Sequence, residues 1–416
     1  MNVFERLESN VRAYCRAYPA VFDKALNARQ WDENGVEFID FFAGAGVLNY
    51  GHNNERQRQA IIDYMLADGV THSLDLHTTA KRTFIERFED IILKPRKLEY
   101  KLQFTGPTGT NVVEAALKLA RKVTGRSTVA AFTNGFHGMT LGALAVTGNA
   151  HYRNVSGVAL NDVLRLPFEG YAGTGVGSLD MIRQTLADSS SGVEAPAAFL
   201  VETVQAEGGV NVAGKEWLQA LQALAKEYGA LFIIDDIQLG NGRTGHFFSW
   251  EDMGLDPDLV CLAKGIGGFG TPMGLLLIRP ELDQWSPGDH TGTFRGQNLS
   301  FVAGSEALAY YENDDFLKSV QEKGRYMEER LNNIVANHKK LNFEVRGRGM
   351  MQGLDTHSPA IAKKIMAAAA KQRVIVGACG TDGRVIKACP PLTIEQETLE
   401  RGLDLLEAAV NEGVTQ

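Results

Sequence analysis

The sequence predicts an α/β fold: a large domain with a mostly parallel sheet flanked by helices, joined to a smaller α+β domain. In the middle of the chain, short apolar runs alternate with helical patterns of roughly 10–15 residues, as in crossover units on a parallel sheet. Two of these runs, AAFLV and ALFII, are apolar at every position, which is typical of strands covered on both faces. After Phe301 the pattern changes to long helices with a few short strands.

The predicted elements follow one another along the chain. In the large domain, strands are predicted over 101–105, 128–132, 197–203, 231–235, 259–263 and 274–279, and helices over 111–122 and 216–228. In the tail, helices are predicted over 303–311, 316–338, 359–372 and 394–412, and strands over 343–348 and 384–387. We expect an N-terminal segment, 1–49, that joins the small domain, then a large domain, 50–305, and a C-terminal small domain, 306–416.

The composition excludes several classes of protein. The 416 residues include 44 glycines but only 12 prolines, with no collagen period, which favours an enzyme with tight turns around a small ligand. A net charge of −8 argues against nucleic-acid binding. No apolar run reaches the ~18 residues that cross a bilayer, so no membrane association is expected. The N-terminus lacks the apolar core of a secretion signal, and four scattered cysteines fit a reducing cytoplasm.

Two stretches match the G-x-G-x-x-G string of dinucleotide-binding proteins, GNGRTG at 240–245 and GIGGFG at 265–270. That fingerprint opens a helix directly after a strand. The first stretch does not lead into a convincing helix, and the second leads into another strand. A dinucleotide-dependent oxidoreductase therefore remains only as an alternative.

The stretch TGPTGT, residues 105–110, lies between a predicted strand and a predicted helix. Unpaired N–H groups at a helix N-terminus, together with the hydroxyls of Thr108 and Thr110, suit a phosphate monoester. An ordinary glycine-rich strand–helix turn is the alternative.

Two charged side chains end apolar strands. Asp235 ends LFIID, where ligands of open α/β sheets bind, and a buried carboxylate there indicates a cationic partner. Lys264 ends LVCLAK, and burial lowers the pKa of an amine, which suits Schiff-base chemistry. The alternatives are that Asp235 caps a turn and that Lys264 extends to solvent.

A third loop, FTNGFHG, carries Phe136 and His137 between glycines. The ring of Phe136 could stack on a planar cofactor, or it could fill the core of the loop. No HExxH or CxxC pair occurs, and His72 and His77 have no third ligand nearby, so no metal site is expected.

The order of these elements resembles the class III, pyridoxal-phosphate-dependent aminotransferases of fold type I: a phosphate turn, an aromatic loop, a strand-end aspartate and a strand-end lysine. The resemblance covers essentially the whole chain, from IDFFAGAGVLNYGHNN to VIKACPPL. The stretches VETVQAEGG, DDIQLGNGRTG and HTGTFRGQNLSFVAG are most similar to the diaminobutyrate-forming branch of ectoine biosynthesis.

The resemblance implies a role for each matching residue. Lys264 would carry pyridoxal 5′-phosphate, and Asp235 would pair with the pyridinium nitrogen. Phe136 and Ile237 would cover the two ring faces, and Gln238 would contact the ring 3-oxygen. The remaining cofactor residues would bind the phosphate: Gly109, Thr110 and Thr293, the last from a neighbouring subunit. A homodimer or higher homo-oligomer with a shared site follows.

Two departures concern the substrate. Many relatives pair a glutamate, here Glu207, with a tail arginine that otherwise binds the α-carboxylate of glutamate. Here that arginine is Lys387, a point charge rather than a bidentate fork. Arg295 stands where relatives have glycine and adds a cation near the expected site.

The resemblance implies transfer of the amino group of L-glutamate to L-aspartate 4-semialdehyde, giving L-2,4-diaminobutyrate and 2-oxoglutarate. The substrates would be small amino acids and aldehydes. Two further alternatives share the fold: a class III enzyme for ornithine, putrescine or 4-aminobutyrate, and an aminomutase.

Overall fold

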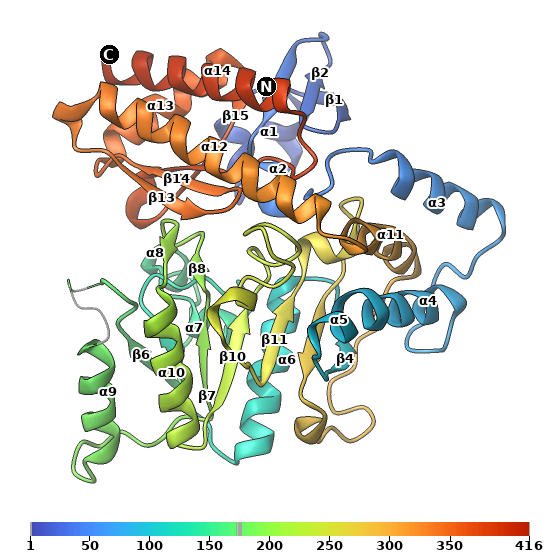
Figure 1. The fold of residues 1–416 in the computed structure, drawn as a ribbon, viewed down its shortest axis with the longest axis vertical. Helices are drawn as coiled ribbons and strands as arrows, with labels where there is room; N and C mark the ends of the chain where they lie inside the picture. Colours follow the sequence, from blue (N-terminus) through green and yellow to red (C-terminus); the bar gives the residue numbers. More distant parts are fainter. Residues whose placement is uncertain (1, 172, 174–176, 416) are drawn as a thin grey trace.

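The centre of the molecule is a seven-stranded sheet that carries the predicted site at one edge (Figure 1). The computed structural model describes residues 2–171, 173 and 177–415. The strands lie in the order β4 (Lys101–Phe104), β12 (Leu275–Ile278), β11 (Leu259–Leu262), β10 (Leu231–Asp235), β7 (Ala198–Val201), β5 (Val129–Phe132) and β6 (Val163–Leu166). Only β12 runs antiparallel to its neighbours, so the prediction of a mostly parallel sheet is confirmed.

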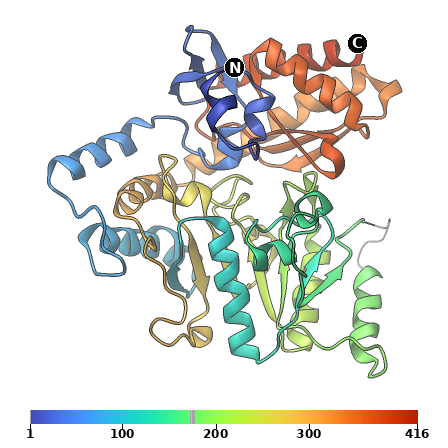
Figure 2. The same cartoon turned by 180° about the vertical axis from the view of Figure 1, so that it is seen from behind.

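Helices cover both faces of this sheet, which explains why its strands are apolar throughout. Alternate strand residues, such as Leu231 and Ile233, share a core with α6 (Gly109–Thr124), which crosses the face seen in Figure 2. The residues between them, such as Phe232 and Ile234, share a core with α10 (Lys215–Glu227) on the opposite face. Because β7, β10 and β11 are parallel, their carboxyl ends meet at the same edge of the sheet.

The C-terminal part forms a second layer of sheet and helix above that edge (Figure 1). Its antiparallel sheet has the order β13 (Glu344–Arg348), β14 (Met351–Asp355), β17 (Val385–Ala388), β16 (Gly377–Cys379). Three helices pack with it: α12 (Asp315–Asn337), α13 (Pro359–Gln372) and α14 (Gln396–Thr415). As predicted, Pro359 stands in the first turn of α13, and the Ser358 side chain caps it by accepting the Ile361 N–H.

The N-terminal strands associate with this C-terminal part. The strands β1 (Phe22–Leu26), β2 (Arg29–Asp32) and β3 (Glu37–Asp40) form a sheet whose last member is β15 (Val374–Ile375), parallel to β3. Ile39 and Phe41 share the core of α12, α13 and α14. The domain boundaries at 49/50 and 305/306 stay a prediction.

The remaining elements connect or cover these layers. The helices are α1 (Val3–Leu7), α2 (Ala43–Gly46), α3 (Glu55–Leu66), α4 (Thr79–Arg87), α5 (Lys94–Arg96), α7 (Leu141–Val146), α8 (Ala150–Arg153), α9 (Gly177–Ala187) and α11 (Asn298–Leu308); the strands β8 (Val204–Gln205) and β9 (Asn211–Val212) form a hairpin. In the described part of the chain, no helix is long and apolar enough to cross a membrane.

Candidate active site

Lys264 lies directly after the apolar strand β11, at the start of a short 3-10 turn. Its backbone is left-handed, with φ of 52°, a conformation that costs a non-glycine residue about 1–2 kcal/mol. No described residue lies within hydrogen-bonding or ion-pairing distance of its amine. Burial lowers the pKa of Lys264, although Glu207 acts in the opposite direction. The result is an unpaired amine that loses its proton more readily than an exposed lysine.

Asp235 ends β10, the strand next to β11, and is only 5% exposed. One carboxylate oxygen lies 2.7 Å from Nδ1 of His137, and the other accepts the backbone N–H of Ile237 at 3.2 Å. Asp235 therefore both caps a turn and presents a buried negative charge, so the two sequence-based interpretations are compatible. The sequence placed His137 in the right loop but gave no sign of this contact.

The predicted phosphate turn forms the N-terminus of the 16-residue helix α6. The side chain of its N-cap residue, Thr108, makes no capping hydrogen bond. The first backbone N–H groups of the helix are therefore not bonded to that hydroxyl. The hydroxyl of Thr110 lies 2.6 Å from that of Thr140. A Cβ on Gly109 would lie 3.1 Å from the Ile237 side chain, so the glycine leaves room beside that residue.

These residues surround a single cavity of about 280 Å³. Seven predicted cofactor residues line it: Gly109, Thr110, Phe136, Asp235, Ile237, Gln238 and Lys264. The eighth, Thr293, does not; it is exposed on a separate loop, as a residue offered to a neighbouring subunit would be. An unpaired amine, a buried carboxylate, apolar side chains and a helix N-terminus together fit pyridoxal phosphate.

The same cavity contains one carboxyl group that the sequence analysis did not single out. Glu202 follows β7 and is 6% exposed. Its Oε2 accepts the backbone N–H of Phe136 at 3.0 Å. Glu202 lies in the VETVQAEGG stretch, and its place after an apolar strand was the only available signal.

Glu207 and Lys387 meet beside the cavity as a buried ion pair. Burial alone would raise the pKa of Glu207, but Lys387 and then Lys264 outweigh it and lower the value to about 2. The pKa of Lys387 is correspondingly raised by Glu207, against the effect of burial. Gln238 donates to Glu207 at 3.1 Å, which joins the pair to the cofactor cavity.

Arg295, the other predicted substrate residue, does not reach this group within one chain. Arg295 lies on the loop that also carries Thr293, and its guanidinium is 3.9 Å from the carboxylate of Asp75. A cavity of about 540 Å³ instead opens next to Glu207, with Phe136 and Tyr152 among its lining residues.

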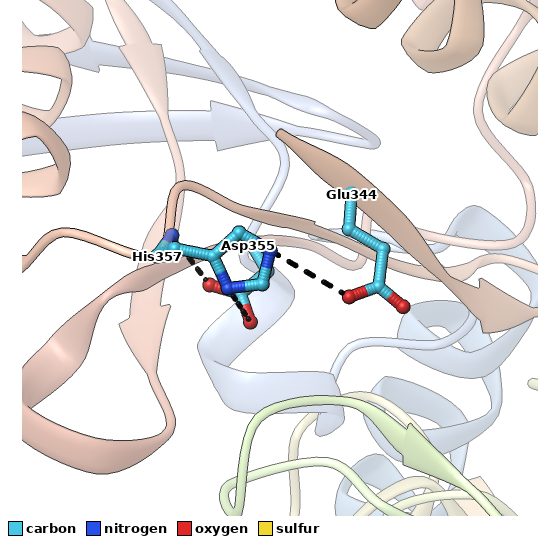
Figure 3. Close-up of side chains that lie close together, drawn as sticks. All are labelled: Glu344, Asp355 and His357. Carbon is cyan, nitrogen blue, oxygen red and sulfur yellow. Dashed lines mark hydrogen bonds and ion pairs between the residues drawn. The ribbon is translucent and has the colours of Figure 1, made fainter. Parts of the chain in front are cut away.

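A cluster in the C-terminal part has the composition of a metal site. Glu344, Asp355 and His357 place a ligand atom each within 4.8 Å of one another (Figure 3). Asp355, however, already lies 2.9 Å from Arg346 and 3.0 Å from Arg384. Two guanidinium groups neutralise the acidic charge that a cation would need, so the cluster is a network of ion pairs.

Comparison with known proteins identifies relatives along the whole chain. The model of the family described as Aminotransferase class-III matches residues 12–410. The chain is 52% identical over 410 residues to the diaminobutyrate–2-oxoglutarate transaminase of Halalkalibacterium halodurans, covering 99% of this chain and 96% of the relative. It is 49% identical over 418 residues to the protein of that name in Bordetella parapertussis, covering 100% and 96%.

Solved structures share the fold. The ornithine aminotransferase of Toxoplasma gondii superimposes with a TM-score of 0.85 at 24% identity, covering 98% of this chain and 93% of that one. A taurine:2-oxoglutarate aminotransferase from Bifidobacterium kashiwanohense, solved in complex with PLP and glutamate, gives 0.84 at 24% identity, covering 94% and 92%.

Proposed function

The chain belongs to the class III aminotransferases, and we propose that it moves the amino group of L-glutamate to L-aspartate 4-semialdehyde. The products are L-2,4-diaminobutyrate and 2-oxoglutarate. The observation that carries the choice of substrates is the similarity, at about half of all positions over the whole chain, to relatives named for this reaction. The enzyme is an aminotransferase, and its cofactor is pyridoxal 5′-phosphate.

The residues around the cavity divide the work of holding this cofactor. Lys264 would hold it through its amine, Asp235 would keep the proton on the pyridinium nitrogen, and Gln238 would contact the 3-oxygen. Phe136 and Ile237 would cover the ring, while Gly109 and Thr110 would bind the phosphate. When bound, the cofactor supplies an electron sink for the pair left by breaking the substrate Cα–H bond.

Once the substrate amine has displaced Lys264 from the cofactor, the freed side chain would also be the general base and acid of the reaction. Its lowered pKa leaves a larger share of neutral amine, which takes the proton from the substrate Cα and later returns one. His137 fixes the orientation of the Asp235 carboxylate.

Lys387 and Glu207 provide the carboxylate site. A substrate carboxylate competes with Glu207 for the ammonium of Lys387. When the substrate has no carboxylate beside Lys387, Glu207 keeps the ammonium paired, so both kinds of substrate can bind. A lysine offers one point of contact where an arginine offers two, which weakens the case for ornithine-type substrates. Arg295 supplies a second cation from the partner subunit.

A homodimer is the minimal active unit in this proposal. Exposed apolar side chains gather on α3 and on the loop after it, which Phe294 contacts at His72, and this supports a large contact: Ile62, Met65, Leu66, Val70, Leu74, Leu76 and Phe294. Phe294 packs against His72, 5.3 Å between ring centroids, and stands next to Thr293. Burial of this surface would bring Thr293 to the partner's cavity.

We propose that the enzyme acts in the cytoplasm and that its diaminobutyrate feeds ectoine biosynthesis, with a siderophore or a peptide antibiotic as the alternative destinations. All four cysteines are free thiols, three of them buried, which suits a reducing compartment.

Product identification tests the function directly. Purified enzyme with L-glutamate and aspartate semialdehyde should release 2-oxoglutarate and diaminobutyrate in equal amounts, as measured by mass spectrometry. Faster turnover with ornithine, putrescine or 4-aminobutyrate would replace the substrate assignment. Amino transfer within one molecule, without 2-oxoglutarate, would indicate an aminomutase.

A further inference from the structure

Two carboxyl groups end neighbouring strands at the same level of the central sheet. The strands β7 and β10 are parallel, and Val201 lies opposite Ile234. Glu202 and Asp235 follow these two residues, and both side chains line the cofactor cavity. Each is almost fully buried, 6% and 5% exposed. Two adjacent carboxylates would repel each other strongly in such a site.

The two groups have different partners. Asp235 contacts the imidazole of His137 at 2.7 Å, whereas Glu202 has one hydrogen-bond partner among the described residues, the N–H of Phe136. No cation of the described chain lies within ion-pairing distance of Glu202. Burial, and then the charge of Asp235, raise the pKa of Glu202 well above its ordinary value. Glu207 acts in the same direction, and Lys264 opposes it with a smaller effect.

The N–H that Glu202 accepts belongs to the residue whose ring faces the cavity. Phe136 stands between Gly135 and His137, whose own contacts hold the rest of the loop: Gly135 accepts the N–H of Gly148, and His137 donates its N–H to Thr147 and contacts Asp235. The ring of Phe136 contacts Tyr152 edge to face, with centroids 5.5 Å apart. The bond to Glu202 is the one by which the backbone N–H of Phe136 itself is attached to the end of β7.

We propose that Glu202 is a positioning residue: a neutral carboxylic acid that fixes Phe136 over the cofactor and leaves Asp235 as the only charge facing the ring nitrogen. This inference rests on the proposed cofactor site but not on the identity of the amino acceptor. A neutral group can accept the Phe136 N–H without competing for the pyridinium proton. The oxygen of a glutamine would accept the same bond, whereas an alanine would leave the N–H buried and unpaired.

Two variants of the holoenzyme separate charge from position. E202Q should keep the affinity for pyridoxal phosphate and kcat within about 3-fold, and the pH dependence of the cofactor absorption should not move, because neither charge nor hydrogen bond changes. E202A should weaken cofactor binding about 10-fold, the effect of losing about 1.4 kcal/mol. Cofactor titration by absorbance and steady-state kinetics provide these values.

An infrared measurement on the cofactor-free protein tests the charge of Glu202 without activity. Asp236 and Asp258 also have raised pKa values, so the wild type and E202Q are compared as a difference spectrum at the pH of the activity assay, where the bands of those two groups cancel. A protonated-carboxyl band should be present in the wild type and absent from E202Q. This readout remains valid even if E202A fails to fold.

Two results would overturn the proposal. One is an E202Q variant that binds the cofactor as poorly as E202A, or whose infrared spectrum matches that of the wild type. Either outcome would mean that Glu202 acts as a charged carboxylate. The other is a folded E202A variant with unchanged cofactor affinity. Failure of the proposed function is separate: the wild type would bind pyridoxal phosphate and form no diaminobutyrate.

Discussion

Asp235 and Asp355 are both buried carboxylates at strand ends, yet their surroundings differ. Asp355 ends β14, is fully buried, and contacts Arg346, Arg384 and His357 at 2.9, 3.0 and 3.5 Å. Asp235 contacts only an imidazole and a backbone N–H, beside a cavity. Asp355 is neutralised by the protein itself, whereas Asp235 keeps a charge that a ligand can use.

The amine near Asp235 completes the contrast. Lys264 has no ion-pair partner among the described residues, while in the Asp355 cluster the side chains of Arg346 and Arg384 are bound. A collection of charged side chains becomes a reactive site when some of them are left unpaired beside an open volume. Where the pairing is complete, the collection stabilises the fold.

The largest effect is expected at Lys264. K264A should lower kcat at least about 10⁴-fold, because the substrate Cα loses its general base. Thermal unfolding of the cofactor-free protein should change little, since the amine makes no hydrogen bond. Rapid transamination by K264A would show that the unpaired amine beside Asp235 is not needed for the reaction, and the contrast with the Asp355 cluster would fail.

The next effect is expected at Asp235. D235N keeps the shape but removes the charge, and should lower kcat about 10²–10³-fold, as other losses of electrostatic stabilisation do. Steady-state kinetics at saturating cofactor would measure it. If D235N matched the wild type, the proton on the ring nitrogen would need another source.

D355N should produce the opposite pattern. Leaving two guanidinium groups underpartnered should cost roughly 1–3 kcal/mol of unfolding free energy. The ratio kcat/KM should stay within about 2-fold. D404N is the matched control, since Asp404 pairs with Arg330 at the surface and its loss should cost at most about 1 kcal/mol. Urea unfolding compares the three proteins, and stabilisation by added Zn²⁺ would contradict the ion-pair interpretation.

The last effect concerns stability alone and depends on pH: Asp236 lies between the two cases. Burial raises its pKa to about 7, despite hydrogen bonds from Ser249 and the charge of Arg348. The folded state favours its neutral form, so this contribution is present below the ordinary pKa near 4 and is lost as pH rises through about 7. D236N should therefore show a flatter stability between about pH 4 and pH 7, by up to about 1.4 kcal/mol per pH unit. Thermal unfolding across that range gives the slope, and identical slopes for both proteins would contradict the expectation.

The sequence predicted those parts of the site that follow apolar strands or open a helix. Asp235, Lys264 and the turn before α6 are such parts, because an apolar run fixes where its last side chain emerges. The same local patterns predicted helix α13 and the places along the chain of β4, β5, β7, β10, β11 and β12, but not β6 or the order of the strands in the sheet.

Contacts between distant segments could not be predicted from local patterns. The bond from Phe136 to Glu202 joins the turn after β5 to the end of β7, and depends on the register of the sheet. The pairing of Asp355 with Arg346 and Arg384 also requires three strands to align. Thr293 and Arg295 do not line the cavity of their own chain, so the roles proposed for them require a second copy.

The pairing of β3 with β15 has a consequence for how the enzyme is made. The residues around Ile39 emerge early from the ribosome, but their partner strand at Val374 emerges near the end of synthesis. Lys387, which neutralises Glu207, comes later still. Because domains fold as they emerge, the central sheet and Lys264 precede Lys387. A chain that ends before Val374 lacks the partner strand of β3 and leaves Ile39 and Phe41 without the core that α13 and α14 provide.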